Sequence, residues 1–176
     1  MTLRSRGETQ CVLSVTRAWD GAPLASANHV EFTLEHSGDL SLTVDAPLWT
    51  EPAVDCPPGR VPELWRYSVA ELFIWGGEDR YLELELAPNG HWWLLELSTW
   101  RSRCREDLDL DVSFQRGVDR WQATAVIRAA LLPPRPWRLS ACAIWGEASD
   151  RSHAMSHPTL GAMPDFHQPS AFSPSW

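Results

Sequence analysis

Residues 81–97 read YLELELAPNGHWWLLEL, and they indicate the fold more clearly than any other part of the chain. Over residues 82–86 leucine alternates with glutamate, and successive side chains of a β-strand point to opposite faces. Asn89-Gly90 then supplies the positive-φ positions that a tight turn between antiparallel strands needs. An apolar run follows the turn. We therefore predict a β-hairpin over this stretch.

The same alternation occurs on both sides of this hairpin. Residues 30–44 alternate around a turn at residues 36–39, and residues 108–127 alternate around a turn at residues 116–119. Residues 137–145 alternate as well, but their second face is only half polar, which is typical of a strand inside a sheet. Eight to ten strands at this spacing, separated by turns, predict an all-β, antiparallel β-sandwich of the jelly-roll type.

Little of the chain favours helix. Residues 127–132 predict at most one short helical turn, which Pro133-Pro134 would end. Residues 45–62 and 147–176 are rich in Pro, Ser and His without periodicity, so we expect long loops there, where binding sites are often built. The length of 176 residues and the apolar content of 44% predict a single domain over residues 1–176.

Composition narrows the classes of partner. The net charge is −8 and all fifteen cationic side chains are arginine, with no sign of a basic stripe, so nucleic acid is not an expected partner. Residues 1–8 contain cations but no apolar run behind them, and no apolar run approaches the ~20 residues of a membrane span. We expect a cytoplasmic protein without membrane contact. The sequence makes no prediction of the oligomeric state.

The four cysteines are widely spaced. They form no C-x-x-C pair, which argues against a zinc knuckle and against a redox motif. We expect reduced and mostly buried thiols. The cysteines are Cys11, Cys56, Cys104 and Cys142.

A second informative stretch, residues 64–75, reads LWRYSVAELFIW. If it forms one strand, Trp65 and Glu71 share a face with further aromatic rings. Glu71 would then be a carboxylate on a concave aromatic surface, where it can accept hydrogen bonds from ligand hydroxyls. The alternative is a structural role, in which Glu71 forms a partly buried ion pair with an arginine such as Arg66 or Arg138.

Several segments resemble the DOMON-like superfamily, and in particular the family 9 carbohydrate-binding modules. Trp65, followed six residues later by Glu71, resembles the family's Trp-containing segment and the strand after it, and residues 81–90 resemble its next hairpin. Residues 164–172, PDFHQPSAF, resemble its C-terminal motif, and residues 19–22 resemble its opening loop. The P-D-F-H ending is also similar to that of uncharacterised intracellular DOMON-like proteins.

The resemblance implies a sugar site. In family 9 modules two aromatic rings enclose a terminal sugar and a glutamate binds its hydroxyls; at the matching positions this chain has Trp65, Phe166 and Glu71. Phe166 stands where the family has Trp, and Glu85 stands where the family has a sugar-binding arginine, so different hydroxyls would be bound. The candidate ligand-binding residues are Trp65, Tyr67, Glu71, Glu85, Phe166 and His167.

The resulting hypothesis is a noncatalytic module that binds a small polyhydroxylated ligand, a sugar or glycan, in an aromatic-lined cleft without a cofactor. The chain has no nucleophile elbow and no P-loop. Glu83 with Glu85, or Glu71 with Glu96, resemble a glycosidase pair, although alternating strand glutamates usually form a solvated face. An intracellular sugar-acting hydrolase or isomerase, with Glu71 and His167 as acid and base, is the alternative.

A metal ion or a haem group bound to the chain would be a further alternative. His153 and His157 have the i, i+4 spacing that chelates a metal on a helix, but the surrounding proline and serine disfavour a helix, so no metal site is expected. A haem-binding DOMON domain would use Met155 or Met163 with a histidine as axial ligands. Structural calcium, which related modules often carry, would find loop oxygens at Asp45, Asp55 and Asp165.

Overall fold

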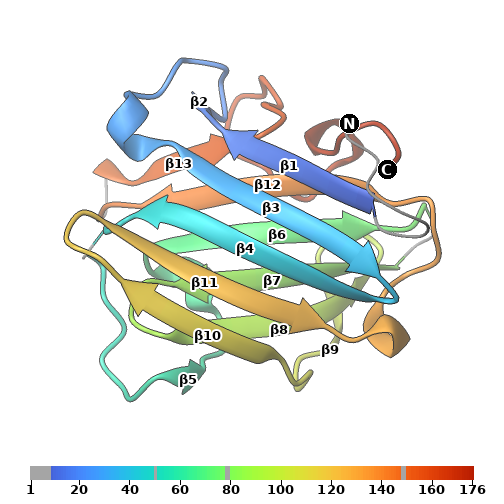
Figure 1. Cartoon of the computed structure of the whole chain (residues 1–176). Coiled ribbons are helices and arrows are strands. Elements are labelled where there is room, and N and C mark those ends of the chain that lie inside the picture. Colours follow the sequence, from blue (N-terminus) through green and yellow to red (C-terminus); the bar gives the residue numbers. More distant parts are fainter. Residues whose placement is uncertain (1–8, 50, 78–79, 148–149) are drawn as a thin grey trace.

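The chain folds as two β-sheets packed face to face, which confirms the predicted all-β sandwich (Figure 1). The computed structural model describes residues 9–49, 51–77, 80–147 and 150–176. Within these ranges nine strands have six or more residues, and four shorter strands complete the sheets. The long strands therefore match the predicted eight to ten.

The first sheet, at the front of Figure 1, has five strands. The hairpins predicted at residues 30–44 and 108–127 are both in it, and they join through their inner strands. In spatial order the strands are β1 (Thr9–Val15), β3 (Val30–Ser37), β4 (Asp39–Pro47), β11 (Arg120–Ile127) and β10 (Asp111–Arg116).

The second sheet has eight strands and lies behind the first in Figure 1. It contains the hairpin predicted at residues 81–97, and the strand predicted at residues 137–145 is internal, as expected. All pairs are antiparallel except that of β5 with β8. The order is β2 (Arg17–Ala18), β13 (Ser152–Met155), β12 (Arg138–Trp145), β6 (Val69–Trp75), β7 (Arg80–Ala87), β8 (His91–Ser98) and β5 (Gly59–Arg60), with β9 (Ser102–Arg105) paired to β8.

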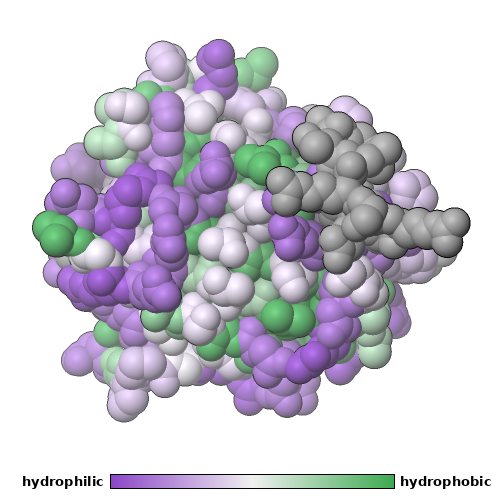
Figure 2. Space-filling model, in the orientation of Figure 1, coloured by the Kyte–Doolittle hydropathy of each residue, from purple (hydrophilic) through white to green (hydrophobic). Residues whose placement is uncertain are grey.

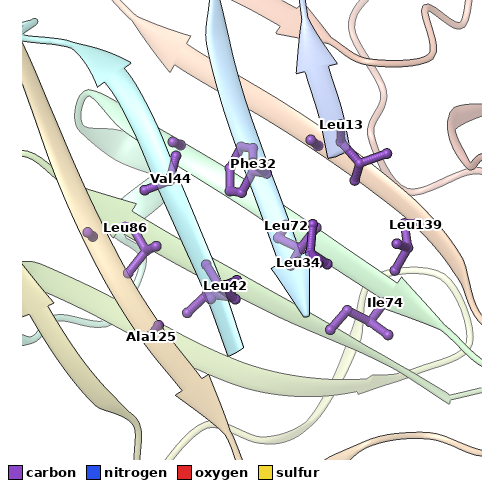
Figure 3. Close-up of a cluster of buried hydrophobic side chains, with 14 of the residues drawn as sticks. Leu13, Phe32, Leu34, Leu42, Val44, Leu72, Ile74, Leu86, Ala125 and Leu139 are labelled. Atoms are coloured by element: carbon purple, nitrogen blue, oxygen red, sulfur yellow. The ribbon is translucent and has the colours of Figure 1, made fainter. Parts of the chain in front are cut away.

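The main core lies between the two sheets. Figure 3 shows Phe32 and Leu42 from the first sheet meeting Leu72 and Leu86 from the second, and all four are buried. Burying a side chain of this size contributes about 1.5–3 kcal/mol. On β6 and β7 the even-numbered residues face this core, so the odd-numbered residues face away from the first sheet.

Those odd-numbered side chains are covered by a second apolar cluster. Phe73 and Tyr81 from the sheet pack there with Phe166 and Phe172 from residues 164–176, called here the C-terminal segment. The central strands of the second sheet are thus buried on both faces, which is typical of strands with near-continuous apolar runs.

The outer face of the first sheet is more polar. Thr33, Thr43 and Thr124 are neighbours on β3, β4 and β11 and point outward, and Figure 2 shows pale, weakly polar residues over the middle of this face. Arg120 and Asp45 form a salt bridge on the same face. This one-sided burial explains why the alternation of hydrophobic and polar residues is so regular in these strands.

Strand β12 holds the C-terminal segment in place. The Ser173 N–H donates to the Leu139 carbonyl at 2.8 Å, and the Leu139 N–H donates to the Ser173 hydroxyl at 3.0 Å. Trp137 and Trp176 exchange two backbone hydrogen bonds. The Arg138 guanidinium donates to the carbonyls of Pro169, Phe172 and Ser173.

The strand predicted over residues 64–75 is shorter than expected and begins at Val69. Trp65 and the residues beside it form a 3-10 turn, η2 (Leu64–Arg66), because the buried Leu64 anchors the turn and Arg151 binds the carbonyls of residues 65–67. Residues 65–67 pair with neither β12 nor β7, whose ladders with β6 begin at Val69 and Ala70. Placing Trp65 and Tyr67 on the strand was therefore wrong.

The remaining local features are short. The described ranges contain no α-helix, and none of their helices is long and apolar enough to cross a membrane. A 3-10 turn, η3 (Ala129–Leu131), lies where the sequence predicted one. Besides η2, the structure also describes η1 (Ser26–Asn28) and η5 (Pro169–Ala171). The segments predicted as loops contain the short strands β5 and β13.

All four cysteines are free thiols. The prediction that most of them are buried is wrong, because only Cys142, on the central strand β12, is buried. Cys56 lies in a loop and Cys104 on the edge strand β9, and both are exposed.

Candidate functional site

A cavity of about 340 Å³ opens on the outer face of the eight-stranded sheet, away from the main core. Outward-facing side chains of β6, β7 and β8 form its floor, and η2, the turn after β8 and the C-terminal segment form its walls. Its apolar lining is Trp65, Trp93, Leu95, Leu97, Ile144, Pro164 and Phe166, and its polar lining is Glu71, Glu83, Arg101, Arg103, His153 and His167.

Three glutamates lie together at the floor. Glu71 on β6 is directly opposite Glu85 on β7, and Glu83 is two residues earlier on the same face of β7. One carboxylate oxygen of each lies within 4.8 Å of the others, and the three residues are at most 5% exposed. Like charges opposite one another destabilise a sheet, so this arrangement requires compensation.

Little in the described chain neutralises this cluster. No salt bridge reaches Glu71 or Glu85, and Glu83 has only His167 Nε2, at 4.0 Å. Oε1 of Glu71 and both oxygens of Glu85 have no hydrogen-bond partner, although the nearby Trp65 N–H favours the charged form of Glu85. The pKa values of Glu71 and Glu85 are raised well above the usual range, first by burial and then by repulsion from Glu83. Burial also raises the pKa of Glu83, to about 7.

A tyrosine and a histidine stand beside Glu83. The Tyr81 hydroxyl accepts the Arg101 backbone N–H at 3.0 Å and lies 2.7 Å from Nδ1 of His167. A hydroxyl oxygen can accept two hydrogen bonds, so in the bond with Tyr81 Nδ1 can either donate its proton or accept that of the hydroxyl, and Nε2 faces Glu83. Burial and then the charge of Arg101 lower the pKa of His167 to about 4, and burial raises the pKa of Tyr81 to about 12. Both groups are therefore neutral at pH 7.

Two arginines give the rim its positive charge. The Arg101 guanidinium donates to Asp165 at 2.6 Å, and Asp165 also accepts the backbone N–H of His167, which ties the rim to the C-terminal segment. Arg103 lies with its guanidinium 5.0 Å from the centre of the Trp93 ring. Cationic donors thus stand above an acidic floor.

Four of the six predicted ligand-binding residues line the cavity, namely Trp65, Glu71, Phe166 and His167. Glu85 is fully buried and belongs to the carboxylate cluster rather than to the lining. Tyr67 lines a different, small crevice, because the η2 turn directs its side chain elsewhere. Its predicted place in the cleft is wrong, whereas ligand binding by the other residues stays a prediction.

The alternative ion pair of Glu71 is also wrong. Arg66 pairs with Glu63 at 2.8 Å, within the η2 turn. Arg138 is occupied by the carbonyls of the C-terminal segment. Arg151 is the arginine whose charge acts on Glu71, but it forms no salt bridge within the described chain. Within the described residues Glu71 is therefore not a member of an ion pair.

From the sequence, Glu83 was considered only as half of a glycosidase pair and not as a ligand-binding residue, because the alternating glutamates of β7 were expected on a solvated face. The C-terminal segment and η2 cover that face. A signal was available in residues 91–97, HWWLLEL, which are apolar on both faces and therefore indicate a strand and neighbours buried on both sides. No local signal marks Trp93, Arg101 and His153, which only the fold brings together.

The histidines and methionines considered as ligands do not converge. His153 lines the cavity, whereas His157 contacts the adjacent serine hydroxyl. Met155 is fully buried in the outer apolar cluster, and Met163 is 72% exposed.

The aspartates considered for calcium are also occupied elsewhere. Asp45 pairs with Arg120, and Asp165 pairs with Arg101; Asp55 is exposed. In the part of the chain that the structure describes, the group of acidic side chains whose oxygens converge is that of Glu71 and its two neighbours on β7.

The fold is shared with a solved structure. The crystal structure of a “putative carbohydrate-binding protein” from Bacteroides uniformis superposes with a TM-score of 0.65 and 14% identity, over 93% of this chain and 84% of that one. At this identity the likeness concerns the fold alone. It agrees with the predicted sandwich, while the DOMON-like assignment stays a prediction.

Curated relatives show the family. No family model matches the chain. It is 30% identical over 164 residues to UPF0462 protein C4orf33 of Homo sapiens, covering 87% of this chain and 81% of that protein. The Rattus norvegicus homologue is 31% identical over 166 residues, which cover 89% of this chain and 83% of that protein. The Danio rerio homologue is 28% identical over 166 residues, which cover 88% of this chain and 83% of that protein. The chain therefore belongs to the UPF0462 family.

Proposed function

We propose that the chain binds a small polyhydroxylated ligand, a sugar or a sugar-like molecule, in the cavity beside Glu71. The observation that carries the proposal is the buried Glu71 carboxylate, which lines the cavity and has an oxygen, Oε1, that no described group binds. A buried acceptor without a donor costs about 1–3 kcal/mol. A ligand hydroxyl would donate to this oxygen and remove that cost.

The walls of the cavity favour a sugar over other hydroxylated ligands. Trp65, Trp93 and Phe166 offer flat apolar surfaces on which the C–H face of a sugar ring stacks. Arg101 and Arg103 add donors at the rim for hydroxyl or carboxylate oxygens. A volume of about 340 Å³ lies at the lower end of the range for small-molecule sites, which suits a small ligand.

Two likenesses support the same class of ligand. The Bacteroides uniformis protein with this fold is described as carbohydrate-binding. The segment from Trp65 to Glu71 resembles the sugar-binding segment of family 9 modules, and both of these residues line the cavity.

A ligand screen tests the proposal. Sugars, sugar acids and polyols are tested by thermal shift, and compounds that raise the melting temperature are titrated calorimetrically into wild type and Glu71→Gln. We expect at least one compound to bind the wild type, and the variant to bind it at least tenfold more weakly. Glu31→Gln removes the same charge from an exposed position on β3 and should bind as the wild type does. No binding by the wild type, or equal binding by Glu71→Gln, would contradict the proposal.

A hydrolase or isomerase acting on such a ligand is the second candidate, and the placement of Glu83 favours it. Its carboxyl group, with a pKa of about 7, stands near the neutral ring of His167, and groups that titrate near neutrality suit proton transfer. The other pair considered, Glu71 with Glu96, is not together, since Glu96 pairs with Arg80 and does not line the cavity. Incubating each bound compound with the protein and following it by NMR distinguishes the candidates. Turnover that Glu83→Gln abolishes supports the enzyme, and an unchanged compound supports the binding module.

A further inference from the structure

We infer that Glu71, Glu83 and Glu85 form a binding site for one divalent cation that prefers oxygen ligands. The three residues come from the adjacent strands β6 and β7, and the cavity, which Glu71 and Glu83 line, gives an ion access to them. This inference goes beyond the proposed function and does not require a sugar.

The spacing of the carboxylate oxygens fits a single ion. One oxygen of each glutamate lies within 4.8 Å of the others. Oxygens on opposite sides of Mg²⁺ are about 4 Å apart and those around Ca²⁺ about 5 Å, and adjacent ligands are closer. One ion can therefore contact all three side chains while β6 and β7 keep their register.

The charge balance also favours a cation. Three buried carboxylates carry up to three negative charges, and no arginine of the described ranges lies within salt-bridge distance of any of them. Arg101 is paired with Asp165, and Arg151 is bonded to backbone carbonyls. A proton removes one negative charge, whereas a divalent cation compensates two and attracts all three groups at once.

Unbonded oxygens are an observation separate from the clustering. Oε1 of Glu71 and both carboxylate oxygens of Glu85 are buried and accept no hydrogen bond from the described chain. Buried polar atoms in native proteins are bonded in the great majority of cases. Two of the three residues whose oxygens converge thus carry unbonded buried acceptors, which indicates that a ligand of positive charge belongs there.

The ligand types narrow the choice of ion. Three carboxylates favour Mg²⁺, Ca²⁺ or Mn²⁺. When its ring proton is on Nδ1 and donates to the Tyr81 oxygen, His167 offers Nε2, 4.0 Å from Oε2 of Glu83, as a nitrogen ligand, which is the usual arrangement of histidines that bind metals. A mixed set of oxygen and nitrogen ligands suits Mn²⁺ best among these ions, and Mn²⁺ is therefore the probe.

The test is a titration of the full chain, stripped of metal with a chelator and dialysed, with Mn²⁺ at pH 7.5. Electron paramagnetic resonance of the free ion counts the bound ions, and Ca²⁺ and Mg²⁺ are added as competitors. We expect one Mn²⁺ per chain, and a rise in the melting temperature of about 5–10 °C at a hundredfold excess over the dissociation constant. In ¹⁵N-labelled protein, bound Mn²⁺ should broaden the amide signals of β6 and β7 most strongly and those of β3 and β4, which lie in the other sheet, less.

Variants locate the ion. Glu83→Gln and Glu85→Gln should each weaken Mn²⁺ binding at least tenfold, whereas the exposed Glu31→Gln should not. Removing a repulsive charge leaves the metal-free variants at least as stable as the wild type, which circular dichroism checks. No Mn²⁺ uptake at millimolar concentration, or uptake that neither variant reduces, overturns the inference. The Mn²⁺ titration contains no sugar, and the ligand screen is repeated with chelator present. The metal inference and the sugar proposal can therefore fail independently.

Discussion

Glu71 differs from most buried carboxylates because no arginine of the described ranges forms a salt bridge with it. Glu71→Gln keeps the shape of the side chain and removes a charge directly opposite Glu85. We expect the melting temperature of the ligand-free protein to stay the same or rise, while the affinity for the bound sugar falls tenfold or more, about 1.4 kcal/mol. Calorimetric melts and titrations measure both. A melting temperature lower by several degrees with unchanged affinity would instead assign Glu71 a structural role.

Trp65 is a wall of the cavity and yet 39% exposed, so its removal should affect binding more than folding. We expect Trp65→Ala to weaken sugar binding at least tenfold, because the stacked apolar surface is lost, and to change the melting temperature little. Trp100 is equally exposed, at 37%, but does not line the cavity, so Trp100→Ala is the matched control. Equal affinity losses in the two variants would contradict this assignment.

Glu83 makes stability depend on pH in the metal-free protein. Its pKa is about 7 in the folded state and near 4.5 when unfolded, so between these values the folded state holds the extra proton. Its contribution is present below pH 4.5 and is lost as the pH rises through 7, a change of up to about 3 kcal/mol. Glu83→Gln has no carboxyl group at this position and therefore does not lose stability as the pH rises through 7. In melts with chelator, its stability relative to wild type should therefore increase from pH 5 to pH 8.

A constant difference between Glu83→Gln and wild type across that range would show that Glu83 titrates normally. His167 acts in the opposite direction, because its pKa is lowered to about 4 in the folded state and its contribution is lost as the pH falls through that value. Since both proteins contain His167, its effect largely cancels in the comparison.

Among the elements, the hairpins were predictable because each has one face in the main core. The alternation of apolar and polar residues indicates which face of a strand lies in that core. It cannot report that β7 is covered again from outside by the C-terminal segment, which has no periodicity of its own. For the same reason the start of β6 at Val69 was not predictable. It depends on Arg151, far along the chain, binding the carbonyls of residues 65–67.

Arg138 is the main attachment of the C-terminal segment to β12. Its guanidinium donates three hydrogen bonds to carbonyls of that segment. We expect Arg138→Ala to destabilise the protein by about 1.5–3 kcal/mol and to speed amide exchange at Ser173 and Trp176, as hydrogen exchange with mass spectrometry would measure. Arg128→Ala, which removes exposed salt bridges on the other sheet, should destabilise the protein much less, because water and salt screen exposed ion pairs. Unchanged exchange in Arg138→Ala would mean that the backbone hydrogen bonds of Ser173 and Trp176 and the apolar contacts hold the segment without Arg138.

At the scale of the whole molecule, the sandwich was predictable from the sequence, whereas the candidate site was only partly predictable. Family resemblance identified Trp65, Glu71 and Phe166, and all three line one cavity. The acidic cluster below them was not predicted, because it requires knowing that β6 pairs with β7 so that Glu71 lies opposite Glu85. Pairing register is a property of the assembled sheet.

The reactivity of the four free thiols distinguishes exposed from buried parts of the fold. Cys56 and Cys104 are exposed and should react rapidly with an alkylating reagent in the native protein, whereas Cys142 is fully buried on a central strand. Burial also raises the pKa of Cys142, which disfavours the reactive thiolate. We expect mass spectrometry to find all four thiols alkylated only after denaturation without reductant. Rapid labelling of Cys142 in the folded protein would show that the second sheet opens locally.

The pairing of β4 with β11 has a consequence for how fast the chain folds. Their side-chain contact of Gln122 with Asp45 spans 77 residues, so a large stretch of chain must be ordered before this pair forms. The β7–β8 hairpin is local and can form early. We expect refolding on the millisecond-to-second scale of sandwich proteins. Since Phe166 and His167 must also dock onto that early hairpin, stopped-flow experiments should find that binding competence appears after most of the strand signal.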